Sequence, residues 1–196
     1  MSRSIDFFDT QFRKQVAGRD FALNPFETAV LPFVRGRVLD LGCGLGNLTI
    51  AAARKGARVT AVDASPTAIV RIAETSVAEN LGITAVLADI AAYRFAASYD
   101  TVVAIGLLMF MSRDKALGLL AEMKAQIARG GVAIVNVLVE GTTYLEMFQP
   151  GAYYLFRQDE LQDSFTGWKI ELARHDSFDA PGGTKKMFST VVARRP

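Results

Sequence analysis

Short apolar runs alternate with longer amphipathic segments through the central part of the chain. Near-continuous apolar runs of this length are typical of parallel strands that are buried on both faces of a sheet. Five such runs are predicted as strands: residues 37–41, 58–62, 84–88, 100–105 and 132–139. The segments between them predict helices at residues 47–55, 66–80 and 113–129. This alternation predicts an open, doubly wound α/β sheet.

The two ends of the chain depart from this alternation. Residues 24–27 predict the start of a helix, since the asparagine can cap it, the proline suits its first turn and the glutamate can reach back. Residues 168–174 and 187–194 alternate apolar and polar side chains on either side of a Gly182-Gly183 turn. That pattern predicts a β-hairpin, which adds two antiparallel neighbours to make a mostly parallel, seven-stranded sheet.

Composition narrows the class of protein. The chain has 196 residues, of which 51% are hydrophobic and 21% charged, so one globular domain with a substantial core is expected. The net charge is +2, but the last segment, residues 180–196, contains four basic residues and no acid. The rest of the chain is slightly acidic. No basic face runs through the sequence, and a nucleic-acid partner is therefore not predicted.

The numbers of cysteines and histidines argue against a disulfide-stabilised protein and a metalloprotein. Cys43 is the single cysteine and His175 the single histidine, so neither a disulfide framework nor a metal site is expected. The longest strongly apolar run, residues 101–111, is too short to span a bilayer. The first residues lack the continuous apolar core of a signal peptide, and a cytoplasmic protein without membrane contact is expected.

A glycine-rich turn after the first predicted strand is the strongest chemical signal. Gly42, Gly44 and Gly46 follow one another as G-x-G-x-G, between a strand and a helix. Such a turn lets a ligand approach the backbone and the unpaired N–H groups of the helix start. Dinucleotide sites have the spacing G-x-G-x-x-G instead. Asp40 would repel a pyrophosphate, whereas it suits a ligand that carries an ammonium group.

Two further acids follow at the ends of the next strands. Asp63 ends the second strand, where its carboxylate can accept hydrogen bonds from both hydroxyls of a ribose. Asp89 ends the third strand, where it can accept from the exocyclic amine of a base while Ile90 packs on the ring. Together these positions describe a nucleoside with an amino-acid tail and no phosphate, which is S-adenosylmethionine.

With these motifs the sequence resembles the class I S-adenosylmethionine-dependent methyltransferases over about residues 37–139. The resemblance implies the Rossmann-like fold of that family and S-adenosylhomocysteine as product. It implies that the glycine turn lines the methionine tail, that the second acid holds the ribose, and that the residues after it flank the adenine. The implied cofactor-binding residues are Asp40, Gly42, Cys43, Gly44, Gly46, Asp63, Ala64, Ser65, Asp89, Ile90 and Ile105.

A narrower resemblance points to the tellurite-resistance branch of this superfamily. It is carried by residues 99–103 and 107–110, and near the end by residues 165–168, by His175 and by residues 188–190. Members of that branch methylate chalcogen oxyanions or other soft nucleophiles. The resemblance therefore implies a small acceptor of this kind.

The acceptor side is predicted in the loop 175–186. A strand at residues 168–174 should run parallel to the central strands, so its far end points to the ligand edge of the sheet. His175 and either Lys185 or Lys186 could then offer hydrogen bonds to a small anionic or thiol-like acceptor. Soft anions need little help in methyl transfer, whereas a hydroxyl or amine needs a base, and bases are few here.

Other functions remain open at this point. The domain could bind S-adenosylmethionine without catalysis, or methylate an oxygen or nitrogen acceptor in metabolism. A nucleotide-dependent dehydrogenase is disfavoured by the glycine spacing, and a nucleic-acid amino-methyltransferase by the absence of an Asn-Pro-Pro-Tyr-like tetrapeptide after the fourth strand. A monomer or homodimer is expected. Residues 1–36 are predicted as a helical prefix or lid, 37–139 as the cofactor-binding core and 140–196 as the substrate-side segment and terminal hairpin.

Overall fold

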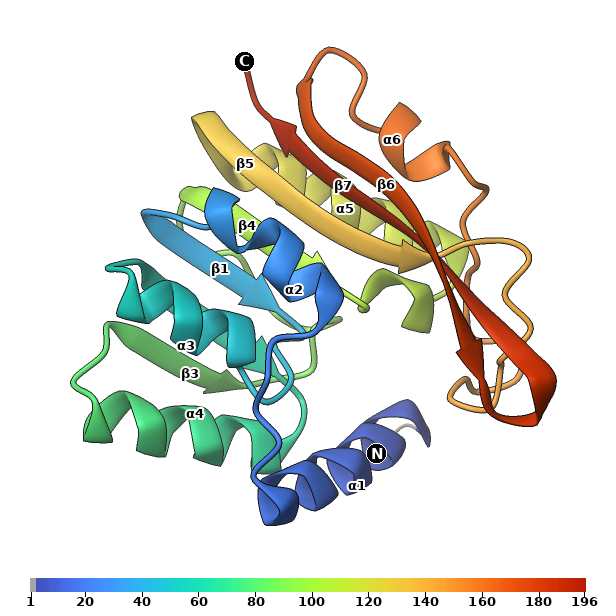
Figure 1. The fold of residues 1–196 in the computed structure, drawn as a ribbon. Coiled ribbons are helices and arrows are strands. Elements are labelled where there is room, and N and C mark those ends of the chain that lie inside the picture. Colours follow the sequence, from blue (N-terminus) through green and yellow to red (C-terminus); the bar gives the residue numbers. More distant parts are fainter. Residues whose placement is uncertain (1–2) are drawn as a thin grey trace.

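A single sheet organises the computed structural model, which describes residues 3–196 (Figure 1). The strand order is β3-β2-β1-β4-β5-β7-β6. The strands are β1 Arg37–Leu41, β2 Arg58–Asp63, β3 Ile83–Leu87, β4 Tyr99–Ile105, β5 Ile127–Leu138, β6 Lys169–Ala180 and β7 Thr184–Arg194. Strands β1 to β5 are parallel, and β7 is antiparallel to both β5 and β6. The predicted doubly wound, mostly parallel sheet with its antiparallel hairpin strand is confirmed.

The helices form two layers around the sheet. Helices α2, α3 and α4 contribute to the core on one face, and α5 and α6 to the core on the other. Helix α1 lies apart from both layers, beside the end of α4 (Figure 1). The helices are α1 Arg3–Gly18, α2 Pro25–Val30, α3 Asn47–Arg54, α4 Pro66–Ala78, α5 Arg113–Gln126 and α6 Glu160–Asp163. None of these helices, within residues 3–196, has the length and apolarity to cross a membrane.

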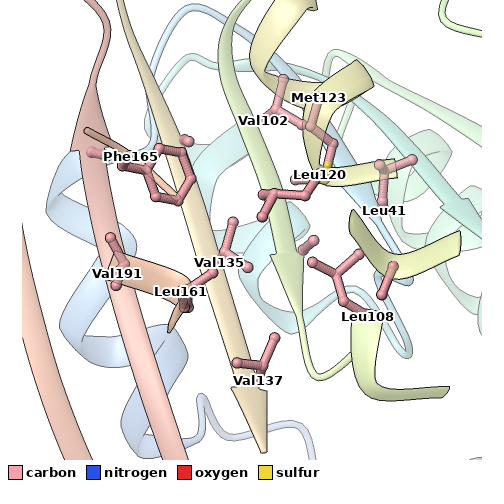
Figure 2. Packing of buried hydrophobic residues seen from close by; sticks show 14 of the residues in the cluster. Leu41, Val102, Leu108, Leu120, Met123, Val135, Val137, Leu161, Phe165 and Val191 are labelled. Carbon is pink, nitrogen blue, oxygen red and sulfur yellow. The ribbon is translucent and has the colours of Figure 1, made fainter. Parts of the chain in front are cut away.

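Successive side chains of a strand point to opposite faces of the sheet, so each strand contributes residues to the cores on both faces. Leu41, Val102 and Val135 project from β1, β4 and β5 toward Leu120 and Met123 of α5 (Figure 2). Val38, Val103 and Ile134 of the same three strands belong to the core on the opposite face, with residues of α3 and α4. Full burial of one such side chain stabilises the fold by about 1.5–3 kcal/mol. The apolar strands are therefore buried on both faces, as their composition predicts.

The terminal hairpin is longer than predicted, and the expectation of a loop at residues 175–186 is wrong. His175 pairs with Ser189 and Asp179 with Lys185 in one continuous antiparallel ladder. Only the tight turn Pro181–Gly183 separates the two strands. His175, Ser177 and Asp179 favour a loop locally, but they lie on the exposed positions of the edge strand β6, where such residues are tolerated.

Candidate functional site

An open cavity of about 1280 Å³ lies at the carboxyl ends of the parallel strands. Residues that follow β1, β2, β3 and β4 line it, together with Asn136 of β5 and residues of α1. The strand order reverses between β1 and β4, because β1 pairs with β2 on one side and β4 on the other. Ligands of doubly wound sheets bind at this reversal, so the cavity occupies the position that the sequence predicts.

The glycine turn leaves β1 with a backbone that other residues would strain. Gly44 and Gly46 have φ angles of 52° and 73°. A Cβ atom on Gly44 would lie 3.2 Å from Cζ of Phe12, and one on Gly46 would lie 2.5 Å from Cγ1 of Ile72. Glycine is thus required both by conformation and by the close packing of α1 and α4.

Replacing Gly46 by alanine should lower the free energy of unfolding by about 2–5 kcal/mol. The positive φ costs an alanine about 1–2 kcal/mol, and forcing Ile72 aside costs about 1–3 kcal/mol more. Urea unfolding followed by circular dichroism measures the change. The matched control is Gly118→Ala in α5, where a Cβ atom meets nothing within 4 Å. This control should stabilise the protein by about 0.5–1 kcal/mol, and equal behaviour of the two variants would contradict the prediction.

Asp63 ties the glycine turn to the end of β2. Its Oδ2 accepts a hydrogen bond from the backbone N–H of Gly44 at 2.9 Å, and its Oδ1 accepts from the N–H of Ser65 at 2.8 Å. Burial raises the pKa of the carboxyl group, while these backbone hydrogen bonds lower it. The carboxylate is therefore held in one orientation at the cavity wall, with lone pairs left for a ligand.

Asp40 is buried deeper in the same end of the cavity. Its Oδ2 accepts a hydrogen bond from Oγ1 of Thr49 at 2.6 Å. Burial raises the pKa of Asp40 to about 7, the Thr49 hydrogen bond opposes this shift, and the carboxylates of Glu27 and Asp63 add to it. A buried carboxyl group with acids around it is stabilised in its charged form by a cation.

Glu27 belongs to this site, although the sequence indicates only a capping role for it. Asn24 and Glu27 form the predicted capping box: Oδ1 of Asn24 accepts from the N–H of Glu27, and Oε2 of Glu27 accepts from the N–H of Asn24. Glu27 also lines the cavity, and burial raises its pKa. No local pattern could reveal this role, because the start of α2 approaches the glycine turn only in the folded chain.

The acidic end of the cavity, which comprises Glu27, Asp40 and Asp63, favours a cationic ligand. Within residues 3–196, none of these three carboxylates forms an ion pair with lysine or arginine. That part of the chain also contains no group of three or more His, Cys, Asp and Glu side chains arranged to hold a metal ion. An ammonium group on a small molecule suits the acidic end.

Of the other predicted cofactor residues, all but Gly46 line the same cavity; Gly46 lies outside the lining and packs against Ile72 of α4. Asp89 is exposed, and its Oδ1 accepts from the N–H of Ala91 at 2.9 Å, while Ile90 is buried beside it. The hydroxyl of Ser65 donates to Asp9 at 2.6 Å. Burial raises the pKa of the Cys43 thiol well above its usual range, with the nearby acids adding to the effect, so the thiol stays protonated. The residues brought together are Gly42, Cys43, Gly44, Ala64, Ser65, Asp89, Ile90 and Ile105.

The predicted acceptor residues are separated by the fold. His175 lies on β6 at the sheet edge, outside the cavity lining, with Nε2 at 3.6 Å from Oδ1 of Asp159. Lys185 is exposed and also outside the lining. Lys186 does line the cavity, where it is half-buried and holds Nζ at 4.4 Å from the ring centre of Tyr144. Burial lowers the pKa of Lys186.

Helix α1 forms one wall of the cavity. Oδ1 of Asp9 accepts the hydrogen bond from Oγ of Ser65, and Phe12 packs over Gly44. The ring of Phe8 meets that of Phe110 edge to face at 5.2 Å between centres. The helical prefix predicted from the aromatic sequence therefore lies across the ligand edge of the sheet.

The fold and the acidic, glycine-lined end of the cavity define a class of domain. Residues 38–131 match the family model described as a methyltransferase domain. The predicted resemblance to the class I S-adenosylmethionine-dependent methyltransferases is confirmed for this part of the chain.

Within this class the chain is similar to proteins of the TehB type. It is 29% identical over 166 residues to the probable S-adenosyl-L-methionine-dependent methyltransferase TehB of Haemophilus influenzae, covering 81% of this chain and 57% of the relative. The chain thus spans little more than half the length of that relative. The crystal structure of TehB from the same organism has the same fold, with a TM-score of 0.76 at 24% identity over 98% of this chain and 67% of that one.

A third similarity concerns sulfur chemistry. The chain is 26% identical to a solved structure described as acting in the conversion of a disulfide bond into a thioacetal group during echinomycin biosynthesis. The match covers 89% of this chain and 82% of the other, with a TM-score of 0.65.

Proposed function

We propose that this protein transfers the methyl group of S-adenosylmethionine to a small, soft or anionic acceptor. The observation that carries the proposal is that groups of opposite charge line one cavity. Glu27, Asp40 and Asp63 form the acidic end, and the half-buried Lys186 lies on the wall formed by β7. A cationic cofactor and an anionic acceptor would each find a complementary environment there.

Each residue of the acidic end would meet a different part of S-adenosylmethionine. Asp40 would hold the α-ammonium group, with Glu27 beside it. The remaining lone pairs of Asp63 would accept hydrogen bonds from the ribose hydroxyls. Asp89 and Ile90 would meet the edge and the face of the adenine, as the family resemblance implies. The glycine turn leaves room for the methionine tail against the backbone.

The protein's contribution to methyl transfer would be alignment and exclusion of water. The cofactor supplies a methyl carbon that is already electrophilic because it is bound to a sulfonium sulfur. Holding an acceptor in line with that bond can lower the barrier by roughly 7–11 kcal/mol. Helix α1, in residues 1–36, would act as the lid over the bound cofactor, residues 37–139 as its binding core, and residues 140–196 as the acceptor side.

Measurements of turnover distinguish the proposed function from two alternatives. A non-catalytic binding module would bind S-adenosylmethionine without releasing S-adenosylhomocysteine. A methyltransferase for oxygen or nitrogen acceptors would turn over phenols or amines, for which a base is required. His175, the base considered from the sequence, lies outside the cavity and does not support that alternative.

The experiment is a screen of acceptors with S-adenosylhomocysteine release as the readout. Chalcogen oxyanions, thiols, small phenols and amines are each supplied with S-adenosylmethionine, and binding of the cofactor is measured separately by calorimetry. The proposal expects cofactor binding and turnover of an oxyanion or a thiol. Turnover of amines alone, or binding with no turnover at all, would contradict it.

A further inference from the structure

The acceptor side of the cavity is lined mainly by rings and methionines. We define the aromatic wall as the lining residues Phe7, Phe8, Met109, Phe110, Tyr144, Met147 and Phe188, which pack together in one apolar cluster. Phe7 and Phe8 meet edge to face at 5.3 Å between ring centres, and Phe8 and Phe110 at 5.2 Å. The wall is therefore built from α1, the segment after β4, the segment after β5, and β7.

Lys186 is the half-buried cation on this wall. Its Nζ lies over the ring of Tyr144, and no carboxylate of the described residues pairs with it. Lys115 also lines the cavity, but it is exposed and therefore well solvated. A half-buried ammonium without an anionic partner is stabilised by an anionic ligand.

Two amide side chains that line the cavity each have a buried oxygen without a hydrogen-bond partner, Oδ1 of Asn47 and Oδ1 of Asn136. Asn136 is 1% exposed, and its Nδ2 donates to Oγ1 of Thr190 at 2.9 Å. Its Oδ1 has no partner in the structure. In this amide orientation Asn136 presents its carbonyl oxygen, which accepts hydrogen bonds and does not donate them to an oxyanion.

These surroundings select between the two soft acceptors that the proposed function allows. A chalcogen oxyanion carries its charge on several hydrated oxygens, and the aromatic wall with one ammonium would leave most of them unpaired. An aromatic thiol loses water from an apolar ring instead, which favours binding in proportion to the buried area. Its single sulfur needs only one cation.

We propose that the acceptor is a thiol with an apolar body about the size of an aromatic ring, bound as the thiolate with its sulfur at Lys186. This inference rests on the proposed function. Proximity of the ammonium lowers the pKa of the thiol, which releases its proton to solvent. A sulfur lone pair then forms the new bond to the methyl carbon. The bond from that carbon to the sulfonium sulfur breaks, and its electron pair stays on the sulfur of S-adenosylhomocysteine.

The test compares three probes: thiophenol, 2-mercaptoethanol and tellurite. We expect kcat/KM, calculated per concentration of the ionised acceptor, to be at least about tenfold higher for thiophenol than for either of the others. The variant Lys186→Met keeps the unbranched apolar part of the side chain and removes the charged ammonium group. It should lower kcat/KM for thiophenol by about tenfold to a hundredfold, which is the range for a lost charge-assisted hydrogen bond. It should also move the pH profile for thiophenol to higher pH.

The neighbouring Lys185→Met is the matched control, since Lys185 is exposed and outside the cavity. It should leave kcat/KM unchanged, and the dissociation constant for S-adenosylhomocysteine should be unchanged in both variants, which shows that they are folded. Preference for tellurite or 2-mercaptoethanol, or equal effects of the two substitutions, would overturn this inference alone. Cofactor binding without turnover of any acceptor would overturn the proposed function as well.

Discussion

Replacing Asp63 by asparagine should weaken the binding of S-adenosylhomocysteine by about tenfold to a hundredfold. The backbone N–H groups of Gly44 and Ser65 hold this carboxylate in place and leave lone pairs for the ribose hydroxyls. The asparagine amide has the shape of the aspartate carboxylate but no charge, and its NH2 group cannot accept a hydrogen bond. Each charge-assisted hydrogen bond contributes roughly 1.5–3 kcal/mol. Titration calorimetry measures the loss directly.

A second ligand and a control variant show whether the loss of affinity in Asp63→Asn comes from the contact with the ribose. Methylthioadenosine lacks the amino-acid tail but keeps the ribose, so its affinity should fall by a similar factor. Asp114→Asn removes an exposed carboxylate of α5 that does not line the cavity, and its affinities should equal those of the unmodified protein. Thermal unfolding must show that Asp63→Asn is folded, because the carboxylate accepts two backbone hydrogen bonds. Unchanged affinity in a folded variant would contradict the ribose assignment.

The proposed cofactor half of the site is predictable because its residues lie at or directly after the ends of the strands. Asp40 is the last residue but one of β1, two residues before Gly42, and Asp63 is the last residue of β2. Parallel strands bring their carboxyl ends to one edge of the sheet, so local sequence is enough to place both acids there. The sheet itself is predictable for the same reason, because apolar runs and turn residues are local signals.

The acceptor half depends on register, which the sequence does not specify here. Side chains alternate between the two faces of a strand, so adjacent lysines on β7 point to opposite sides. Lys186 therefore reaches the cavity while Lys185 is exposed. His175 begins the segment predicted as a loop, but it pairs with Ser189 within the hairpin and stays at the sheet edge. Glu27 is likewise brought to the site by the packing of α2 and not by any motif.

Binding of S-adenosylhomocysteine should strengthen by about a hundredfold between pH 5 and pH 8. Burial and the neighbouring acids raise the pKa of Asp40 to about 7, so the group is protonated in the ligand-free protein at pH 5. An ammonium group binds the carboxylate and not the neutral acid. Apparent affinity therefore rises about tenfold per pH unit below 7 and levels off above it, as linkage requires. Calorimetry across this pH range gives the profile, and the number of protons released on binding should be close to one near pH 5, about one half at pH 7 and close to zero above pH 8.

Three comparisons decide whether Asp40 causes this dependence. Methylthioadenosine, which has no ammonium group, should bind with nearly the same affinity throughout. Asp40→Asn should bind S-adenosylhomocysteine weakly and without the rise, whereas Glu27→Gln should keep the rise but move its midpoint to lower pH, because the charge of Glu27 raises the pKa of Asp40. A group whose folded pKa is raised makes the ligand-free fold less stable as pH increases from about 4 to about 7. Saturating S-adenosylhomocysteine should offset this loss of folding stability. In the complex the ammonium group of the ligand stabilises the ionised Asp40, whereas in the ligand-free protein the ionised Asp40 has no cationic partner.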